Sequence, residues 1–356
     1  MGIKNLSSLY RDDDTVTKRL HLENFRGKRL AIDAGIWLNS MWASACSRHI
    51  DEIDIIGQQP DQAVVMTYWL ERVVDELQTL LSYHIVPLVV FDGKAPDDKA
   101  VTAAKRREDV SKARQRLSYL EEKREDGIYS SEDIVQARKI VKAARTVPMV
   151  QDDVLDNLLR AVGIPTLRAK GEAERLCASL CRQGWAWAVL SSDSDCLTHG
   201  CTMVVSKMLG HTCTVIHLYP LLAKLGLTFT QFVDLCIMCG CDYNTNIPQV
   251  GVQRSLNLIR EYGSIDNLPD KYDTSPLNYQ RCRELFALVD PEELTDDLIS
   301  DQSVNLTPIP DHARDVLDSY NASYWLERLV PLLSAVDPIP RLSYIRPPQP
   351  VYLKTI

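Results

Sequence analysis

Several features that would indicate other classes of protein are missing from these 356 residues. No apolar run approaches the roughly 18 residues that a membrane-spanning helix needs, and the N-terminus lacks the apolar segment of a secretory signal. The chain begins Met-Gly, but Leu6 stands where N-myristoylation requires serine or threonine. We therefore predict an intracellular protein of the nucleus or cytoplasm, with no membrane partner.

The ten cysteines lack the spacing of a zinc site or of a disulfide framework. Cys236 and Cys239 form one Cys-x-x-Cys pair, and no second pair follows at the spacing of a zinc finger. Others, such as Cys177 and Cys181, stand in apolar runs, where a buried free thiol is expected. Reduced thiols agree with a location in the nucleus or cytosol.

The chain also lacks the positive net charge common in nucleic-acid-binding proteins, since its formal net charge is -8. The charge is unevenly distributed, however. Residues 99–145 contain 13 Lys or Arg and 8 Asp or Glu, which gives +5 and leaves -13 for the rest. This basic segment predicts two helices broken near residues 127–131, with Ser131 capping the second. Charge alone would also fit a solvated helical hairpin.

What the sequence does contain is a set of seven carboxylates in short clusters: Asp33, Asp92, Glu172, Glu174, Asp193, Asp195 and Asp242. Asp33, Asp92 and Asp193 each follow an apolar run typical of a buried parallel strand. Ligands bind beyond the carboxyl ends of such strands, so we expect these acids to converge there. Taken singly, each acid could equally be a helix cap or a surface residue.

Carboxylates that converge need compensating positive charge. Two of them about 4 Å apart repel each other by roughly 4 kcal/mol at an effective dielectric constant near 20. Because hard cations prefer oxygen ligands, the set predicts two Mg²⁺ ions, which Mn²⁺ can replace. Glu172 and Glu174 are two residues apart, so both can face one site only at an irregular first helical turn or through bound waters.

Buried strands followed by helices predict an α/β fold with a central, mostly parallel sheet flanked by helices. Six ordered motifs then resemble the flap endonuclease branch of the XPG-type structure-specific 5′ nucleases, over residues 1 to about 268. The motifs are Met1–Leu6, Ile32–Ala34, Val90–Lys94, Gly171–Glu174, Ser192–Thr198 and Leu235–Tyr243. The resemblance implies a PIN-like 5′ nuclease fold.

The resemblance also implies a domain organisation. The nuclease domain would span residues 1–268, with an N-terminal part over 1–98 and an internal part over 151–240. Between them, about 99–150 would form a helical arch through which a 5′ single strand passes. A helix-two-turn-helix over about 241–268 would grip duplex DNA, and 269–356 would form a helical C-terminal extension.

Roles for individual residues follow from the same resemblance. The seven acids would hold the metals, and Lys99 and Arg106 would be catalytic residues that hold the scissile phosphodiester. These two are seven residues apart, which is two helical turns, so they project from nearly the same face. The DNA contacts are expected at Gly2, Lys94, Gly251 and Arg254.

Three departures from the family pattern bear on the substrate. Gln249-Val-Gly251-Val stands where relatives have Gly-hydrophobic-Gly-Pro, which argues against the K⁺ ion that this hairpin often binds. Asn39 replaces an aromatic that stacks near the scissile nucleotide, with Trp37 two residues earlier. The expected helix over Gln62–Ser82 places Arg72 among acids, which makes it a poor phosphate-binding surface.

The resemblance thus implies a monomeric flap endonuclease that cuts DNA at single-strand/duplex junctions by a two-metal mechanism, in replication or repair, with 5′–3′ exonuclease activity. The tail carries no recognisable sliding-clamp motif. A 5′ exonuclease, a junction resolvase or an RNA-cleaving member of the superfamily is an alternative. A catalytically silent nucleic-acid-binding scaffold is another, which the retained acids disfavour, since a silent protein has no need of a repulsive cluster.

Overall fold

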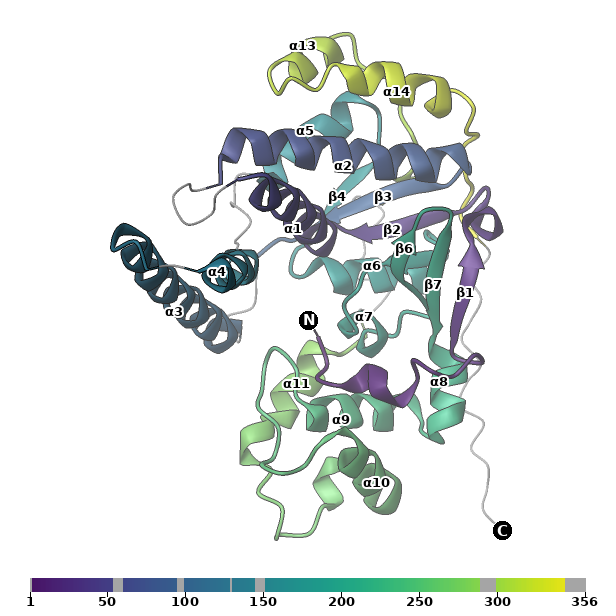
Figure 1. Cartoon of the computed structure of the whole chain (residues 1–356). Coiled ribbons are helices and arrows are strands. Elements are labelled where there is room, and N and C mark those ends of the chain that lie inside the picture. Colours follow the sequence, from purple (N-terminus) through teal and green to yellow (C-terminus); the bar gives the residue numbers. More distant parts are fainter. Residues whose placement is uncertain are drawn as a thin grey trace.

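A computed structural model describes residues 2–53, 60–94, 99–128, 130–144, 151–288 and 299–342. Within them, seven strands form one sheet in the order β1-β7-β6-β5-β2-β3-β4 (Figure 1). The strands are β1 (Thr17–His21), β2 (Arg29–Asp33), β3 (Val86–Phe91), β4 (Thr166–Arg168), β5 (Ala188–Leu190), β6 (Met203–Leu209) and β7 (Thr212–His217). From β6 to β4 the strands are parallel, and β7 runs antiparallel to both β6 and β1. The predicted α/β fold with a mostly parallel sheet is confirmed.

The central strands are covered on both faces, as their apolar sequences predict. Every residue of β2 and β3 is buried. Along β2 the side chains alternate: Leu30 and Ile32 join one hydrophobic cluster, and Ala31 joins the other. The register pairs Ile32 with Leu190 of β5 and Asp33 with Val90 of β3, so the three strands end at the same edge of the sheet.

Helices form a layer on each face of the sheet (Figure 1). One layer contains α1 (Ala34–Glu52), α2 (Gln62–Ser82) and α5 (Gln151–Ala161), and the other contains α6 (Ala173–Arg182) and the short α7 (Asp195–Thr198). The bounds of α2 agree with the predicted helix, and Asp61 caps it by accepting a hydrogen bond from the Ala63 N–H at 2.8 Å.

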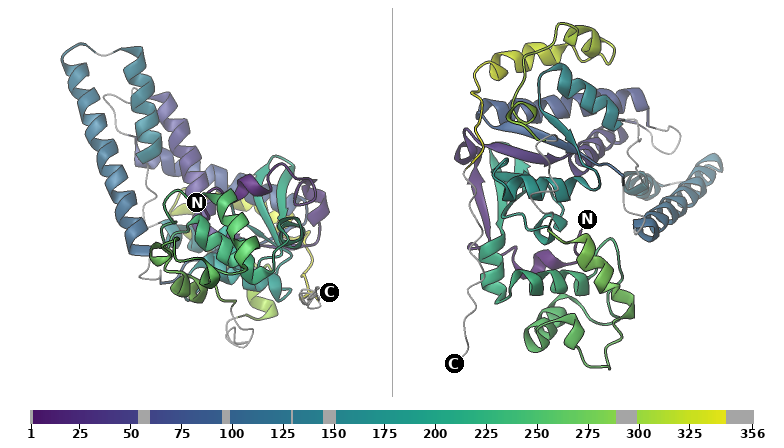
Figure 2. Two further views of the ribbon diagram at one scale, coloured as in Figure 1. Left: turned by 90° about the horizontal axis from the view of Figure 1, so that it is seen from below. Right: turned by 180° about the vertical axis from the view of Figure 1, so that it is seen from behind.

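A helical hairpin projects from the body beside α1 (Figure 2). It consists of α3 (Ala100–Glu125) and α4 (Ser131–Ala144), which confirms the predicted pair of helices and the break between them. The expected cap at Ser131 is wrong, because Ser131 is already helical and Ser130 Oγ accepts from the Asp133 N–H at 3.3 Å. Asp133 stabilises the turn by accepting hydrogen bonds from the Ser130 N–H at 2.8 Å and from Lys123 Nζ at 2.7 Å. The hairpin is tied to the body by an ion pair between Lys142 and Asp51 at 2.8 Å.

A group of helices lies beyond α7, at the bottom of Figure 1. It contains α8 (Leu218–Leu225), α9 (Phe229–Cys239), α10 (Val252–Tyr262) and α11 (Tyr279–Leu285). Among the described residues no single helix is long and apolar enough to cross a membrane, although α8 and α9, bent by 82°, together meet the length and composition required.

The C-terminal helices return to the opposite end of the molecule (Figure 1). There α13 (Ala313–Asp318) packs on α5 and α14 (Tyr324–Leu333) packs on α2. Arg328 of α14 contacts Asp75 of α2 at 2.7 Å. Arg29 of β2, 1% exposed, donates to Asn305 Oδ1 at 2.8 Å and to the Ile339 carbonyl at 2.6 Å, so this late segment is anchored to the central sheet.

Candidate active site

Asp33 and Asp92 meet above Gly35, at the ends of neighbouring strands. A methyl group placed on Gly35 would lie 3.3 Å from Asp92 Oδ2 and 3.6 Å from Asp33 Oδ1. The second oxygen of each acid is bound by the protein: Ser191 Oγ donates to Asp33 Oδ2 at 3.2 Å, and the Ala173 N–H donates to Asp92 Oδ1 at 2.7 Å. These hydrogen bonds orient Asp33 Oδ1 and Asp92 Oδ2 toward the space above Gly35.

Glu172 and Glu174 both reach the site because only one of them stands within the helix. Glu172 is the N-cap of α6 with extended backbone (φ -84°, ψ 139°), and Glu174 belongs to the first turn. Lys99, at the start of α3, contacts Glu172 Oε1 and lies 3.7 Å from Glu174 Oε1. The irregular first turn that the sequence required is therefore present, and the base of the hairpin is tied to the acids.

Asp193, Asp195 and Asp242 complete the acidic region. The Asp195 N–H donates to Asp193 Oδ1 at 2.9 Å, which folds the turn after β5. Gly2 lies against this turn with φ +84°, and a methyl group on it would stand 2.0 Å from Asp193 Oδ1, so a side chain is excluded. Asp242 follows α9, and its charge is among those that raise the pKa of Asp193 and Asp195.

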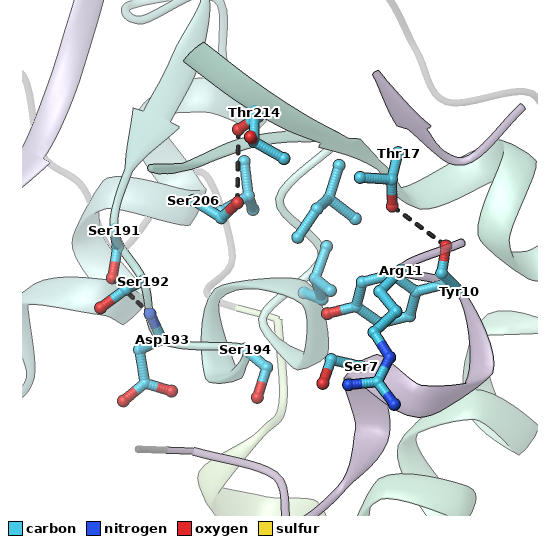
Figure 3. A pocket seen from close by; sticks show the side chains of 13 residues that line it. Ser7, Tyr10, Arg11, Thr17, Ser191, Ser192, Asp193, Ser194, Ser206 and Thr214 are labelled. Atoms are coloured by element: carbon cyan, nitrogen blue, oxygen red, sulfur yellow. Dashed lines mark hydrogen bonds between the residues drawn. The ribbon is translucent and has the colours of Figure 1, made fainter. Parts of the chain in front are cut away.

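The N-terminal segment and the turn after β5 also border a pocket of about 200 Å³ (Figure 3). Figure 3 shows Asp193 and Ser194 on one side of it and Ser7 and Arg11 on another. The Ile3 N–H donates to Ser194 Oγ at 2.8 Å. These contacts hold the first residues of the chain beside the acids.

Burial and mutual repulsion make the acidic region electrostatically unfavourable. Asp33, Glu174, Asp193 and Asp195 are between 1% and 8% exposed. Burial, followed by the charge of Asp33, raises the pKa of Glu174 well above its usual value. Burial, followed by the charge of Asp193, does the same to the pKa of Asp195, whose Oδ1 has no hydrogen-bond partner among the described residues. The site therefore has an excess of negative charge.

Lys99 is a cation in direct contact with two of these acids. Burial disfavours its charged form, but the charges of Glu174 and Glu172 outweigh burial, so the pKa of Lys99 is raised and the side chain stays an ammonium. Arg106 stands two turns further along α3, but its side chain lies outside the described residues.

The donor atoms in this region fit hard divalent metal ions, because all seven predicted ligands are carboxylates and the buried Asp195 Oδ1 has no other described partner. Within the described ranges, no three acidic, imidazole or thiol groups lie close enough to hold one ion as they stand. Binding of a metal would thus require these carboxylates to turn toward each other.

Tyr243 is a part of the site that the sequence interpretation missed. Its hydroxyl donates a hydrogen bond to Glu172 Oε2, and Lys99 Nζ lies 5.5 Å from the centre of its ring. The ring makes an edge contact with Phe286 at 5.6 Å. Burial, followed by the charge of Glu172, raises the pKa of Tyr243, so it remains a donor. Its place directly after Asp242 was the available signal.

Asp152, at the start of α5, was also missed. Burial, followed by the charge of Asp92, raises its pKa. Its sequence context, an acidic first turn of a helix, gives no indication of a site.

The predicted DNA contacts fall in two places. Gly2 and the exposed Lys94 lie close to the acids, and the Lys94 N–H donates to the Lys170 carbonyl at 3.2 Å. Gly251 and Arg254 lie at the start of α10, away from the sheet (Figure 1). Asn39 is exposed, and its amide donates to the Gly35 carbonyl within α1, whereas the Trp37 side chain lies outside the described residues.

Comparison with known proteins agrees with this arrangement. Residues 1–113 match the XPG N-terminal domain, and residues 163–242 match the XPG I-region, so the two matches include all seven acids. Flap endonuclease 1 of Naegleria gruberi is 32% identical over 304 residues, which cover 80% of this chain and 73% of that protein. The chain belongs to the flap endonuclease family of XPG-type nucleases. It is therefore a metal-dependent nuclease that hydrolyses phosphodiester bonds.

Solved structures support the same fold. The flap endonuclease-1 of Methanococcus jannaschii is 21% identical with a TM-score of 0.61, over 91% of this chain and 98% of that one. The catalytic core of Rad2, solved in complex with a DNA substrate, is 19% identical with a TM-score of 0.60, over 93% of this chain and 100% of that one. The expected 5′ nuclease fold is thereby confirmed.

Two buried aspartates provide a test of the electrostatic excess. Asp195→Asn removes a charge that repulsion destabilises, so without metal the thermal midpoint should rise by about 2 °C or more, and added Mg²⁺ should stabilise this variant less than the parent. Asp234 is equally buried at 1% but is paired with Arg283 at 2.7 Å. The matched Asp234→Asn should lower stability by roughly 2 kcal/mol, since Arg283 is only partly buried. Differential scanning calorimetry would measure both, and a fall in the Asp195→Asn midpoint would contradict the repulsion.

A second test concerns Tyr243. Tyr243→Phe keeps the ring on Phe286 and removes only the donor to Glu172, so the Mg²⁺ concentration for half-maximal cleavage should rise roughly tenfold. Calorimetric titration with Mn²⁺ should show the same weakening, while the unfolding midpoint changes little. Tyr68, which donates to Glu52 at 2.8 Å, supplies the control, because Tyr68→Phe should leave metal dependence unaltered. Equal metal dependence in the two variants would show that Tyr243 does not orient Glu172.

Proposed function

We propose that this nuclease is a 5′ flap endonuclease that cuts DNA where a 5′ single strand meets a duplex. The observation that carries the proposal is the contact of Lys99 with Glu172 and Glu174, which joins the base of the basic hairpin to the acidic site. The hairpin and the acids then act as one site. A nucleic acid held by the hairpin would present its backbone to the carboxylates.

The seven acids are the proposed ligands of two Mg²⁺ ions: Asp33, Asp92, Glu172, Glu174, Asp193, Asp195 and Asp242. When bound, such ions supply Lewis-acid charge at the phosphate and make water a stronger nucleophile near neutral pH. Ser191 orients Asp33, the Ala173 N–H orients Asp92, and Tyr243 orients Glu172. Gly2 leaves room beside Asp193 where a side chain would collide.

Lys99 and Arg106 are proposed to hold the scissile phosphate. The Lys99 ammonium would exchange its carboxylate contacts for a non-bridging phosphate oxygen, and Arg106 would donate from the same face of α3. Both charges then stabilise the negative charge that develops as water attacks. This role requires the ammonium form of Lys99, which the neighbouring glutamates favour.

The start of α10 is the proposed contact with duplex DNA away from the cut. Gly251 is its N-cap, and Arg254 is exposed in its first turn. Exposed N–H groups at a helix N-terminus bind phosphate without reading base sequence. Lys94 would add a phosphate contact close to the acids. Duplex held at α10 and single strand held at the hairpin would place the junction between them.

The proposed mechanism assigns no potassium ion to the turn before α10. Backbone carbonyls are typical K⁺ ligands, but here the Asn246 amide donates to the Ile247 carbonyl at 3.4 Å and to the Val250 carbonyl at 3.3 Å. Gln249 keeps the left-handed backbone, at φ +62°, that glycine adopts most easily. The Asn246 amide thus supports a turn that the Val250 N–H closes by donating to the Ile247 carbonyl at 3.0 Å, and the proposed mechanism contains no K⁺.

The proposed roles of Lys99 and Arg106 concern the transition state. Lys99→Ala and Arg106→Ala should each lower the single-turnover cleavage rate by roughly 10²-fold or more, with little change in DNA affinity. Rapid-quench kinetics and a separate binding titration measure the two quantities. Lys224, which pairs with Asp13 at the surface at 2.6 Å, supplies the control, and Lys224→Ala should match the parent. A loss confined to affinity would reduce both residues to ordinary phosphate contacts.

The substrate assignment is tested with a blocked flap. The proposal requires that the hairpin, whose helices of 26 and 14 residues are about 39 and 21 Å long, holds a single strand and not a duplex some 20 Å wide. An open 5′ flap should therefore be cut near its base, and the same flap made double-stranded should resist cleavage. End-labelled substrates with Mg²⁺ reveal the products.

Other outcomes of that experiment would assign a different activity to the protein. Equal cutting of open and double-stranded flaps, or preference for four-way junctions or RNA, would reject flap specificity and keep the nuclease. Absence of cutting on every substrate with Mg²⁺ or Mn²⁺ would favour a silent scaffold.

A further inference from the structure

The flank of the α3–α4 hairpin contains a groove that the proposed cleavage mechanism does not use. It encloses about 580 Å³ between the two helices and lies toward their outer ends. Lys112, Arg116 and Tyr119 line its α3 side, and Gln136 lines its α4 side. Leu120, which is 4% exposed, and the half-buried Ile140 form its floor.

The groove-lining side chains follow a helical repeat. Lys112, Arg116, Tyr119 and Lys123 stand at intervals of four, three and four residues, so they form one stripe along α3. The phenol ring of Tyr119 is 62% exposed, although aromatic rings are usually packed. The other flank of α3 carries Arg107, Arg114, Ser118, Glu121 and Glu125, which have no aromatic ring and no net charge. The exposed aromatic ring and a net positive charge therefore lie on the side of Lys112, Arg116 and Lys123.

The cations of the stripe differ in their availability. Lys123 is committed to Asp133, 2.7 Å away, and stabilises the turn of the hairpin. Lys112 pairs with Glu108 at 2.6 Å, but both side chains are about 60% exposed, so water screens this pair and it exchanges readily for phosphate. Arg116 has no ion pair in the described part of the chain. Lys112 and Arg116 are thus the cations that a ligand can use.

We propose that this groove binds a single strand of nucleic acid, with one base stacked on Tyr119 and the adjoining phosphates held by Arg116 and Lys112. Single-strand sites combine an aromatic platform with flanking cations because every base has a face that stacks and every nucleotide carries a phosphate. The Gln136 amide, across the groove, supplies a donor and an acceptor for base edges. This inference rests on the proposed function, since a 5′ flap is the single strand that the hairpin would meet.

The position of the groove determines which flaps reach it. Lys112 and Tyr119 are 13 and 20 residues beyond Lys99, which is about 20 and 30 Å along a helix. A flap of one or two nucleotides cut near Lys99 does not extend so far. The groove therefore adds affinity for long flaps and none for the shortest ones.

Binding of a labelled oligothymidylate of 15 residues to the full chain, measured by fluorescence anisotropy without divalent metal, tests the inference. Tyr119→Ala should weaken binding roughly tenfold, within the range for loss of one stacked base, and Tyr119→Phe should restore it. Arg116→Ala should weaken binding and reduce the slope of log affinity against log salt by about 0.7, the value for one phosphate contact on a single strand. Arg114→Ala, on the other flank of the same helix, is the matched control and should bind like the parent.

Cleavage separates this inference from the proposed function. With a long flap at limiting enzyme concentration, Tyr119→Ala should be slower than the parent, and with a one-nucleotide flap the two should be equal. The protein could also bind oligothymidylate through Tyr119 and yet cut no flap. That result would support single-strand binding in the groove and reject the assignment as a flap endonuclease.

Equal binding by the parent, Tyr119→Ala and Arg116→Ala would overturn the groove, whatever the enzyme cuts. The exposed apolar side chains near the hairpin turn, Ile128 at 66% and Val135 at 50%, would then indicate a protein contact instead. If Arg114→Ala lost as much oligothymidylate affinity as Arg116→Ala, the groove would also be overturned, because the loss would then reflect the overall positive charge of the hairpin.

Discussion

Four carboxylates that are at most 8% exposed share one edge of the sheet, and their mutual repulsion sets the demands that the rest of the site must meet. The parallel register of β2, β3 and β5 creates this repulsion, since it ends three strands at one level. Hydrogen bonds from Ser191 and the Ala173 N–H fix the orientation of two acids, and Lys99 neutralises part of the charge. A fold that concentrates like charges in this way gains from any cation that enters, which suits an enzyme acting on a phosphate backbone.

Much of this site could be predicted from the sequence, because its determinants are local. A buried parallel strand is an apolar run of a few residues, and the residue that follows it marks the edge of the sheet. This pattern predicts Asp33 and Asp92. The basic segment was equally visible, since Gly127 and Ser130–Ser131 interrupt two long helical stretches, and the structure has α3 and α4 there.

What could not be predicted depends on contacts between distant residues. Glu172 reaches the site because it stands outside α6 in an extended conformation, and only a folded backbone reveals that choice. The hydroxyl of Tyr243 lies 71 positions from the glutamate to which it donates. No local pattern indicates that Arg328 of α14 pairs with Asp75 of α2. Side-chain partners of this kind are set by tertiary packing, which periodicity does not encode.

The anchoring of the C-terminal segment by Arg29 has a consequence for biosynthesis. Arg29 leaves the ribosome early, within the strand at the centre of the sheet, whereas two of its acceptors, Asn305 and the Ile339 carbonyl, emerge more than 270 residues later. A buried guanidinium without acceptors is strongly unfavourable. The N-terminal end of β2, where Arg29 lies, must therefore stay exposed to water during translation. The acidic end of the same strand depends on partners that emerge much earlier, up to Asp242. The nascent chain can therefore assemble the acidic end of the sheet first. The C-terminal segment covers the end near Arg29 last.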